Sequence, residues 1–473
     1  MDTKTKKNLL IYGLFSAITY IYLILPKMAS LSVPVFFILQ FLFIIYILRF
    51  KEGINKKAFL LFIPIFILSL NYFLSGYTEF RGLNLVVILL LYSLFILVIT
   101  DSINILQIKV NHCVKILKNL FTPFKYFLEP FNWMSSLKKE KAKSIKSVIL
   151  ALLITFPILM IVLLFLTSAD MIFGESVNRL FEKIFEVIDI KLFRKIIVSL
   201  FMGFYLFGFM CYIFLYTKTE DNKALKVVKG DIIIFNILLS SILLVYTVFV
   251  IIQFRYLFAG SALPYGISYA EYARRGFFEL VTLSVFNISI IALTMYFMKD
   301  SMYINKSKSG IFTKALLIYL CIVTMFLLAS SFYRMMLYEG EYGSTRLRLL
   351  VFAFLIFEAI ALIFTLVYII KPKLNLFMVY ICIALLYYLT INTVPIDVIV
   401  AKRNIDRFYV TGKIDYSYLI SLSSDAAPQI SKFLEEKNMN IYRSQYFDKF
   451  DFYNDLKGWQ SFNLSLYEAC KLK

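Results

Sequence analysis

Charged side chains that could bind an anion or move a proton gather where long apolar blocks begin or end. Glu271, Arg275 and Glu279 stand four residues apart, so a helix would carry all three on one face. Arg274 lies beside them, and Asp170 ends an earlier apolar block. If the chain is an enzyme, Asp170 or Glu271 is the candidate general base, next to guanidinium groups that could hold a phosphate.

A third charged segment separates two later apolar blocks. Its candidate binding residues, together with one carboxylate in the following block, are Arg334, Glu339, Tyr342, Arg346, Arg348 and Glu358. An ionisable group inside a bilayer costs about 2.5–3.5 kcal/mol on insertion scales, so Glu279, Arg334 and Glu358 need partners or a water-filled cavity. Two interpretations stay open. The network either consists of buried ion pairs that fix helix register, or it lines an outward-facing vestibule for an anionic headgroup, peptide or sugar-phosphate.

Several other chemistries lack the residues they need. His112 is the single histidine, with Cys113 beside it and no second ligand pair at zinc-like spacing, so we expect no metal site. The sequence has no GxxxxGK[ST] phosphate loop, and nothing in it indicates a cofactor. Four of the five cysteines fall in apolar blocks or in the loop at 101–146, which leaves Cys470 without a disulfide partner in the tail.

The elements that must position these residues are membrane helices. Apolar residues make up 60% of the 473 positions and charged residues 17%, against about 45–50% and 25% in soluble domains. The apolar residues occur in blocks of seventeen or more, enough to cross about 30 Å of hydrocarbon as a helix. The eleven predicted spans are 9–25, 31–48, 58–75, 83–99, 147–167, 196–215, 232–255, 276–298, 313–337, 347–370 and 373–391. The predicted fold class is an all-α polytopic bundle.

Basic residues predict the orientation of this bundle. With the N-terminus in the cytoplasm, 26 of the 50 Lys and Arg residues fall in inner segments, 13 in outer loops and 11 in the tail. The same rule accounts for the pI of about 9.4 without a nucleic-acid partner. We therefore expect a multi-pass protein of the bacterial plasma membrane with the C-terminus outside.

The chain divides into four parts on this basis. They are helices 1–4 in 1–100, a basic cytoplasmic loop at 101–146, helices 5–11 in 147–391 with outer loops 168–195, 256–275 and 338–346, and an extracytoplasmic tail at 392–473. The tail has a soluble-like composition and is expected to pack on the outer loops.

Two of these loops have the pattern of amphipathic helices lying on a membrane surface. In the loop at 101–146, apolar residues recur at three- and four-residue steps from Val110 to Phe127. The lysines between them, expected to contact anionic headgroups, are Lys109, Lys115, Lys118 and Lys125. Docking of a partner protein is the alternative. The outer loop 168–195 has the same pattern and is expected to lie along the outer surface.

Five short elements resemble a known family. They are Ser168-Ala169-Asp170 with Phe173; Gln253, Tyr256-Leu257-Phe258 and Gly260; Tyr269 to Arg274 with Gly276-Phe277; Tyr333-Arg334-Met335 with Tyr342-Gly343, Thr345 and Leu347-Arg348; and Asn404-Ile405 with Asp415, Tyr418-Leu419, Ser424-Asp425-Ala426 and Pro428. In this order, over roughly 145–430, they resemble the bacterial multi-pass membrane proteins grouped as domain of unknown function 4173, related to group 4153. Two positions depart from that pattern, Ser344 and the separation of Asn392 from Pro395. The resemblance implies a membrane protein and brings no established activity.

Three functions are consistent with these observations. The first is a non-catalytic envelope scaffold, sensor or complex subunit whose outer vestibule binds an anionic lipid, an envelope polymer or another membrane protein. The second is a membrane enzyme, a transferase acting on a lipid-linked substrate at the outer face. The third is a transporter, although the eleven blocks show no clear internal repeat.

Overall fold

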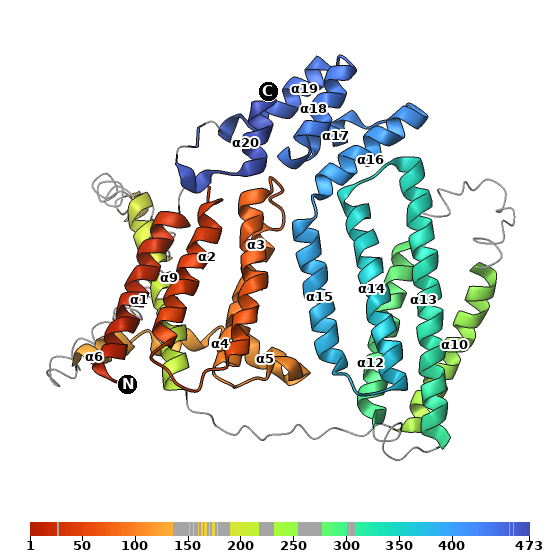
Figure 1. The fold of residues 1–473 in the computed structure, drawn as a ribbon, viewed down its shortest axis with the longest axis horizontal. Helices are drawn as coiled ribbons and strands as arrows, with labels where there is room; N and C mark the ends of the chain where they lie inside the picture. The colour runs from red at the N-terminus through yellow and green to blue at the C-terminus, as the bar shows by residue number, and fades with distance from the viewer. Residues whose placement is uncertain are drawn as a thin grey trace.

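The computed structural model describes residues 1–25, 28–135, 190–216, 231–253, 277–299, 308–453, 455–456 and 458–473, together with Met302 and scattered positions between 151 and 177. These residues form helices and no strand. Two groups of long helices stand side by side, and the C-terminal helices lie across one end of both (Figure 1). The fold is therefore the all-α membrane bundle that the sequence predicts.

The first group contains the N-terminal helices and one later helix. Its members are α1 (Thr3–Leu23), α2 (Ser32–Leu48), α3 (Phe62–Leu74) after the 3-10 turn η1 (Lys56–Leu61), α4 (Arg81–Ile99) and α9 (Ile190–Leu215). Helix α9 packs along α1, far from it in sequence. The chain starts at the end of the group that is opposite the C-terminal helices (Figure 1).

The second group contains α10 (Ile232–Gln253), α12 (Phe277–Lys299), α13 (Lys308–Tyr342), α14 (Arg346–Ile370) and α15 (Leu376–Thr393). Helix α13 packs against α10, α12 and α14, and α15 packs against both α14 and α3. Helix α15 therefore joins the two groups.

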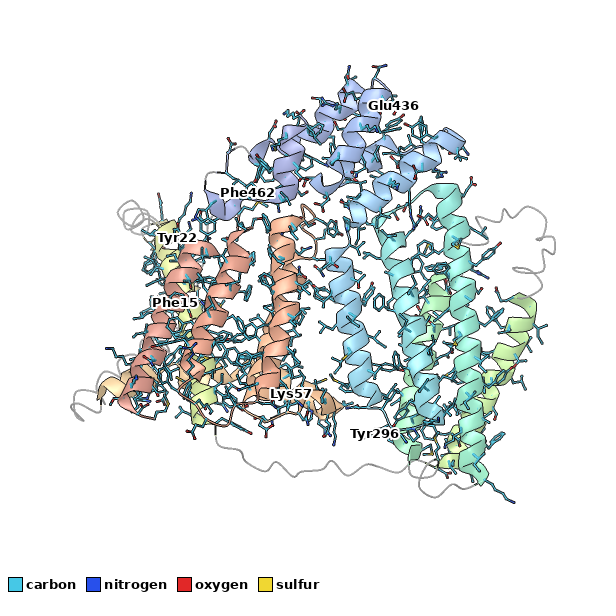
Figure 2. The ribbon with its side chains drawn as sticks, in the orientation of Figure 1. Phe15, Tyr22, Lys57, Tyr296, Glu436 and Phe462 are labelled. Carbon is cyan, nitrogen blue, oxygen red and sulfur yellow. The ribbon has the colours of Figure 1, made fainter. Side chains whose placement is uncertain are left out.

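Residues 396–473 form a compact unit of short helices, here named the cap. It contains α16 (Ile396–Thr411), α17 (Tyr416–Ser421), η6 (Ser424–Ala426), α18 (Ala427–Glu436), α19 (Asn440–Asp448), η7 (Asp451–Tyr453), η8 (Trp459–Ser461) and α20 (Leu464–Lys471). Apolar residues from these helices, among them Val400, Ile430, Phe433 and Phe447, form a core of their own. In Figure 2, Glu436 and Phe462 mark the cap, while Lys57 and Tyr296 mark the opposite end of the two groups.

Most of the spans predicted from the sequence have a counterpart among the described helices, but the count of eleven is not confirmed. Among the described residues, eight helices are long and apolar enough to cross a membrane, and Ser32–Leu48 is a shorter apolar helix of 17 residues. The predicted block 147–167 lies largely outside the described residues. Helix α13 is ten residues longer than predicted. Its 35 residues span about 52 Å, which is more than the thickness of the hydrocarbon core. Because the helix continues to Tyr342, Arg334 lies eight residues before its end.

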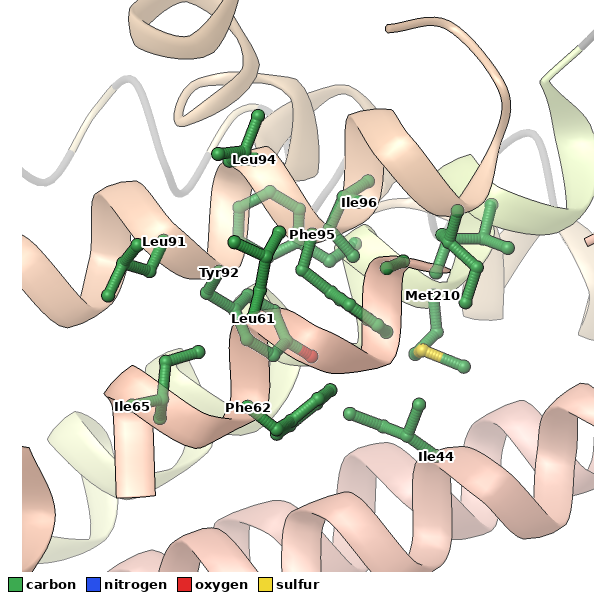
Figure 3. Packing of buried hydrophobic residues seen from close by; sticks show 14 of the residues in the cluster. Ile44, Leu61, Phe62, Ile65, Leu91, Tyr92, Leu94, Phe95, Ile96 and Met210 are labelled. Carbon is green, nitrogen blue, oxygen red and sulfur yellow. The ribbon is translucent and has the colours of Figure 1, made fainter. Parts of the chain in front are cut away.

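Packing within the first group depends on small residues as well as apolar ones. Gly203 of α9 lies so close to α1 that an added Cβ would be 2.6 Å from the carbonyl oxygen of Gly13. This close approach of two backbones is typical of helix pairs in membranes. Farther along the group, Phe95 and Tyr92 of α4 pack among Ile44, Phe62 and Met210 from three other helices (Figure 3).

The two surface helices predicted in loops differ from the structure. The loop after α4 forms α5 (Val110–Asn119), the 3-10 turn η3 (Thr122–Tyr126) and α6 (Glu129–Ser135) rather than one helix. Pro123 lacks a backbone N–H and cannot continue the α-helical pattern. In the predicted outer helix at 168–195, residues 190–195 instead form the first turns of α9, and most of the remainder lies outside the described residues.

Candidate functional site

Arg346 and Asp397 form the central ion pair between the second group and the cap. Thr345 caps the start of α14 by accepting a hydrogen bond from the Arg348 N–H, and Arg346 is the first residue of that helix. Its Nε donates to Oδ1 of Asp397 at 2.6 Å and its Nη2 donates to Oδ2 at 2.8 Å. The Asp397 side chain is 1% exposed and that of Arg346 is 22% exposed. This is the bidentate geometry that an arginine fork gives with a carboxylate.

Further hydrogen bonds complete the surroundings of this pair. The Ser423 N–H donates to Asp397 Oδ2 at 2.6 Å, and the Arg346 N–H donates to the Tyr418 hydroxyl at 2.8 Å. Burial by itself raises the pKa of Asp397, but the Arg346 guanidinium and the Ser423 donors outweigh it and hold the pKa of this carboxyl below its ordinary value. Asp397 is therefore a fixed anion of the cap at neutral pH.

A basic side chain also lies close to the pair. Burial lowers the pKa of Lys449 to about 8, and the charge of Arg346 acts in the same direction. The Lys449 Nζ donates to the carbonyl oxygens of Ile420 and Leu422, inside the cap.

The cap binds the first group through separate contacts. Asp425 accepts hydrogen bonds from Ser75 Oγ at 2.6 Å and from the Gly76 N–H at 2.7 Å, in the loop between α3 and α4. The fully buried Asn463 donates to the carbonyl oxygens of Tyr72 and Ser75, at 3.1 and 3.0 Å.

Backbone hydrogen bonds extend this attachment to the loop between α1 and α2. The N–H groups of Ser30 and Leu31 donate to the carbonyl oxygens of Gln460 and Phe462, at 3.0 and 3.1 Å. Glu79 of the loop between α3 and α4 lies 3.4 Å from Arg346 itself. The cap is thus hydrogen-bonded to both groups of helices.

The structure places several sequence candidates in contacts within the chain. Arg334 is buried, and its Nη2 donates to Gln253 Oε1 at 2.9 Å. Glu339 accepts from Nη1 of Arg403 on α16 at 2.9 Å. The guanidinium of Arg348 lies 4.1 Å from the ring centre of Tyr338 and donates to the Gly343 carbonyl oxygen.

The remaining candidates are dispersed. Tyr342 is exposed at the end of α13, and Glu279 is exposed in the first turn of α12. Glu358 is buried in α14, where neither carboxylate oxygen has a hydrogen-bond partner among the described residues. Asp170 is exposed, and its Oδ1 accepts from the Phe173 N–H at 3.0 Å. Glu271, Arg274 and Arg275 lie outside the described residues.

The predicted network of Arg and Glu side chains stays a prediction, because Glu271, Arg274 and Arg275 lie outside the described residues. The described contacts bring Arg346 to Asp397 and Glu79, and they bring Arg334 to Gln253. Asp397, Glu79 and Asn463 are not among the candidate site residues predicted from the sequence. A usable signal for Asp397 was a carboxylate directly after the last apolar block, at Pro395-Ile396-Asp397, where an aspartate favours a helix N-terminus.

Two cavities flank the part of the second group that is nearest the cap. One of about 410 Å³ lies among α13, α14, α15 and α16, with the Glu339 and Arg403 pair at its edge. The other, of about 370 Å³, lies among Phe277, Met335, Tyr338, Arg348 and Val351. Both are within the size range of ligand pockets and are lined mainly by apolar side chains.

The lysines of the basic loop lie at the end of the molecule opposite the cap. Lys109, Lys118 and Lys125 are exposed, and Lys115 is half-buried with its Nζ 3.4 Å from the Ser102 carbonyl oxygen. On the same segment Val110, Val114, Leu117 and Phe121 are exposed, as an apolar face on lipid requires. Among the described residues, no group of three His, Cys, Asp or Glu side chains is placed to hold a metal ion.

Comparison with known proteins identifies the family. The family model described as Domain of unknown function (DUF4153) matches residues 62–433, most of the chain, and the protein belongs to that family. The match runs from the start of α3 into α18 and so includes Arg346, Asp397 and Asp425. No curated protein and no solved structure matches the chain.

Proposed function

We propose that this integral membrane protein is a non-catalytic scaffold, sensor or complex subunit of the cell envelope, in which the cap couples the two helical groups. The observation that carries the proposal is the double attachment of the cap, through Asp397 to the second group and through Asp425 and Asn463 to the first. Because the guanidinium of Arg346 is paired with Asp397, its charge stabilises the contact between the cap and the second group and is not free to bind an anionic ligand.

The proposed orientation places the cap on the extracytoplasmic side of a bacterial plasma membrane and the N-terminus in the cytoplasm. The excess of Lys and Arg in the segments expected inside supports it. The N-terminus and the cap also lie at opposite ends of the molecule (Figure 1). An anionic lipid, an envelope polymer or another membrane protein would then meet the cap.

Cysteine labelling in intact cells tests the orientation. In a background without native cysteines, Val410→Cys offers an 86% exposed position on the cap, and Lys57→Cys offers an exposed position at the opposite end. An impermeant maleimide should label the first and spare the second until the cells are opened. Labelling of Lys57→Cys alone would show that the orientation is inverted.

The coupling role is tested by genetic complementation of a deletion strain, scored on growth under envelope stress. Asp397→Asn should lose complementation at normal protein abundance, because the cap loses its ion pair with the start of α14. Asp170→Asn should complement fully, since its side chain caps a local backbone N–H. The reverse pattern would contradict the proposal and favour an enzyme with Asp170 as its base.

We also infer a closer kinship with the related group 4173. The support is the ordered series of sequence elements from Ser168 to Pro428, which includes Tyr333-Arg334-Met335 and Ser424-Asp425-Ala426.

A further inference from the structure

Glu358 is a carboxylic acid at the middle of a membrane helix, and its surroundings set it apart from the other acidic residues. It is the thirteenth of the 25 residues of α14, so about 18 Å of helix lies on either side of it. The residue is 6% exposed, and both side-chain oxygens lack a hydrogen-bond partner among the described residues. Among the described residues, no basic side chain forms an ion pair with this carboxyl group, and Ser284 is its polar neighbour.

The free-energy cost of burying a carboxyl group at such a position is much greater for the ionised form than for the neutral form. A buried carboxylate without a counter-charge loses its hydration and gains nothing in return, whereas the neutral acid loses only ordinary polar contacts. Acidic side chains inside membrane spans commonly belong to proton relays for this reason.

Among the described residues, the groups on the helices around Glu358 supply no positive charge to it. On α12, Ser284 lies beside the carboxyl group, and Glu279 is exposed at the helix start. On α13, the Arg334 guanidinium is directed to Gln253 of α10. On α15, the Tyr380 hydroxyl forms a hydrogen bond with Thr365, at 2.5 Å.

Polar side chains continue from this position across the second group. Asn287 lies one turn beyond Ser284 on α12, which places both on one face of the helix. Asn287 accepts from the Tyr246 hydroxyl of α10 at 2.8 Å and donates to Thr324 of α13 at 3.1 Å. Ser284, Asn287 and Thr324 are all fully buried. A layer of buried hydrogen-bonding side chains therefore continues from Ser284 across the second group.

The cavity bounded by Arg348 and Val351 lies on the cap side of Glu358. Val351 precedes Glu358 by seven residues, about 10 Å along α14. The cavity volume of about 370 Å³ is enough for several water molecules. Water that entered there would approach the carboxyl from the cap side of the bundle.

We propose that Glu358 is a proton-binding site within the second helical group, occupied by a proton in the resting protein and in exchange with water on the cap side. On release, the carboxyl O–H bond breaks, the proton passes to water, and a carboxylate remains beside Ser284. The site goes beyond the proposed scaffold role, because it adds a titratable element in the membrane beneath the cap.

Infrared difference spectroscopy of the purified protein in lipid tests this proposal. The spectrum of the wild type minus that of Glu358→Gln at neutral pH should contain the C=O band of a protonated carboxylic acid, and raising the pH should convert it to carboxylate bands. Glu279→Gln, which removes an exposed carboxylate from the adjacent helix, should give no acid band. Ser284→Ala should shift the frequency of the Glu358 band by removing its polar neighbour.

Chemical labelling of the wild-type protein tests the same proposal without a variant, and so remains informative if a variant does not fold. A membrane-permeant carbodiimide reacts with protonated carboxyl groups in apolar surroundings to give an N-acylurea. Mass spectrometry should find this adduct on Glu358, with a yield that falls as the pH rises. A difference spectrum with carboxylate bands alone at neutral pH, or adducts on other carboxyl groups and none on Glu358, would overturn the proposal. Either result would indicate that Glu358 is an ionised carboxylate at neutral pH.

Discussion

The guanidinium of Arg346 and the carboxylate of Asp397 are held together by two parallel hydrogen bonds of 2.6 and 2.8 Å. The first residue belongs to the start of a membrane helix, and the second lies in the first turn of the cap. They are 51 positions apart in sequence, so the pair closes a loop that contains α14, α15 and the turn between them. This contact is one of several that attach the cap to the second group, and the Glu339–Arg403 pair is another.

Asp397→Asn is expected to destabilise the cap by about 3 kcal/mol, because it leaves a partly buried arginine without its counter-ion. Trp459 in the cap contacts Tyr22 of α1 and reports on this unit once Trp133→Phe has removed the other tryptophan. The measurement is the midpoint of thermal unfolding by Trp459 fluorescence. Glu79→Gln is the matched control. The Glu79 side chain is 63% exposed and lies 3.4 Å from the same arginine, so Glu79→Gln should lower the stability by less than about 1 kcal/mol. Equal losses in both variants would argue against the special role of Asp397.

The same ion pair predicts a dependence of cap stability on acid pH. The pKa of Asp397 is lower in the folded protein than in the unfolded chain, so its contribution is present above the unfolded value of about 3.9 and is lost as pH falls through the folded value. The wild type should therefore lose more stability than Asp397→Asn when the pH is lowered below about 4. Unfolding midpoints of the two proteins, compared across that range, provide the check. Parallel curves would show that another group governs the acid transition.

Asn84 of α4 and Asn392 of α15 connect the two helical groups inside the membrane region. The Asn84 Nδ2 donates to Asn392 Oδ1 at 2.9 Å, and the Tyr388 hydroxyl donates to Asn84. Asn84→Ala should destabilise the protein by about 1–3 kcal/mol, because it leaves buried partners unsatisfied. Survival of the monodisperse peak after heating in detergent measures the loss. Thr393→Ala, at an exposed position that bonds within its own helix, should have little effect.

Close packing of α9 on α1 gives a prediction that involves no charge. Gly203→Ala would place a Cβ 2.6 Å from the Gly13 carbonyl oxygen and 2.8 Å from the Ala17 Cβ. The two helices must then separate, so thermal stability should fall although alanine is the better helix former by about 1 kcal/mol. Gly82→Ala, with no atom within 4 Å, should be neutral or stabilising. A gain of stability at both positions would contradict the contact between α1 and α9.

The helices were predictable because a bilayer requires uninterrupted apolar blocks, and a block such as 83–99 matches α4 (Arg81–Ile99) to within two residues. The partners of the charged residues could not be predicted from the sequence. Arg346 and Glu358 look alike in sequence, as ionisable groups at or inside one apolar block. Arg346 meets Asp397 because the cap folds back over α14, which is a long-range contact that spacing does not encode. Pro123 was a local signal that the basic loop would break, and its missing N–H explains the turn η3.

A disulfide cross-link between Ser75→Cys and Asp425→Cys tests most directly whether the cap, which continues the chain from α15 of the second group, is also attached to the first group. In a cysteine-free protein that also carries a protease site inserted after Asn222, mild oxidation should join these positions, whose native side chains are 2.6 Å apart. After cleavage, the two fragments should migrate together without reductant and separate with it. Ser75→Cys paired with the exposed Val410→Cys serves as the control and should not cross-link. Fragments of the first pair that separate without reductant would contradict the double attachment of the cap.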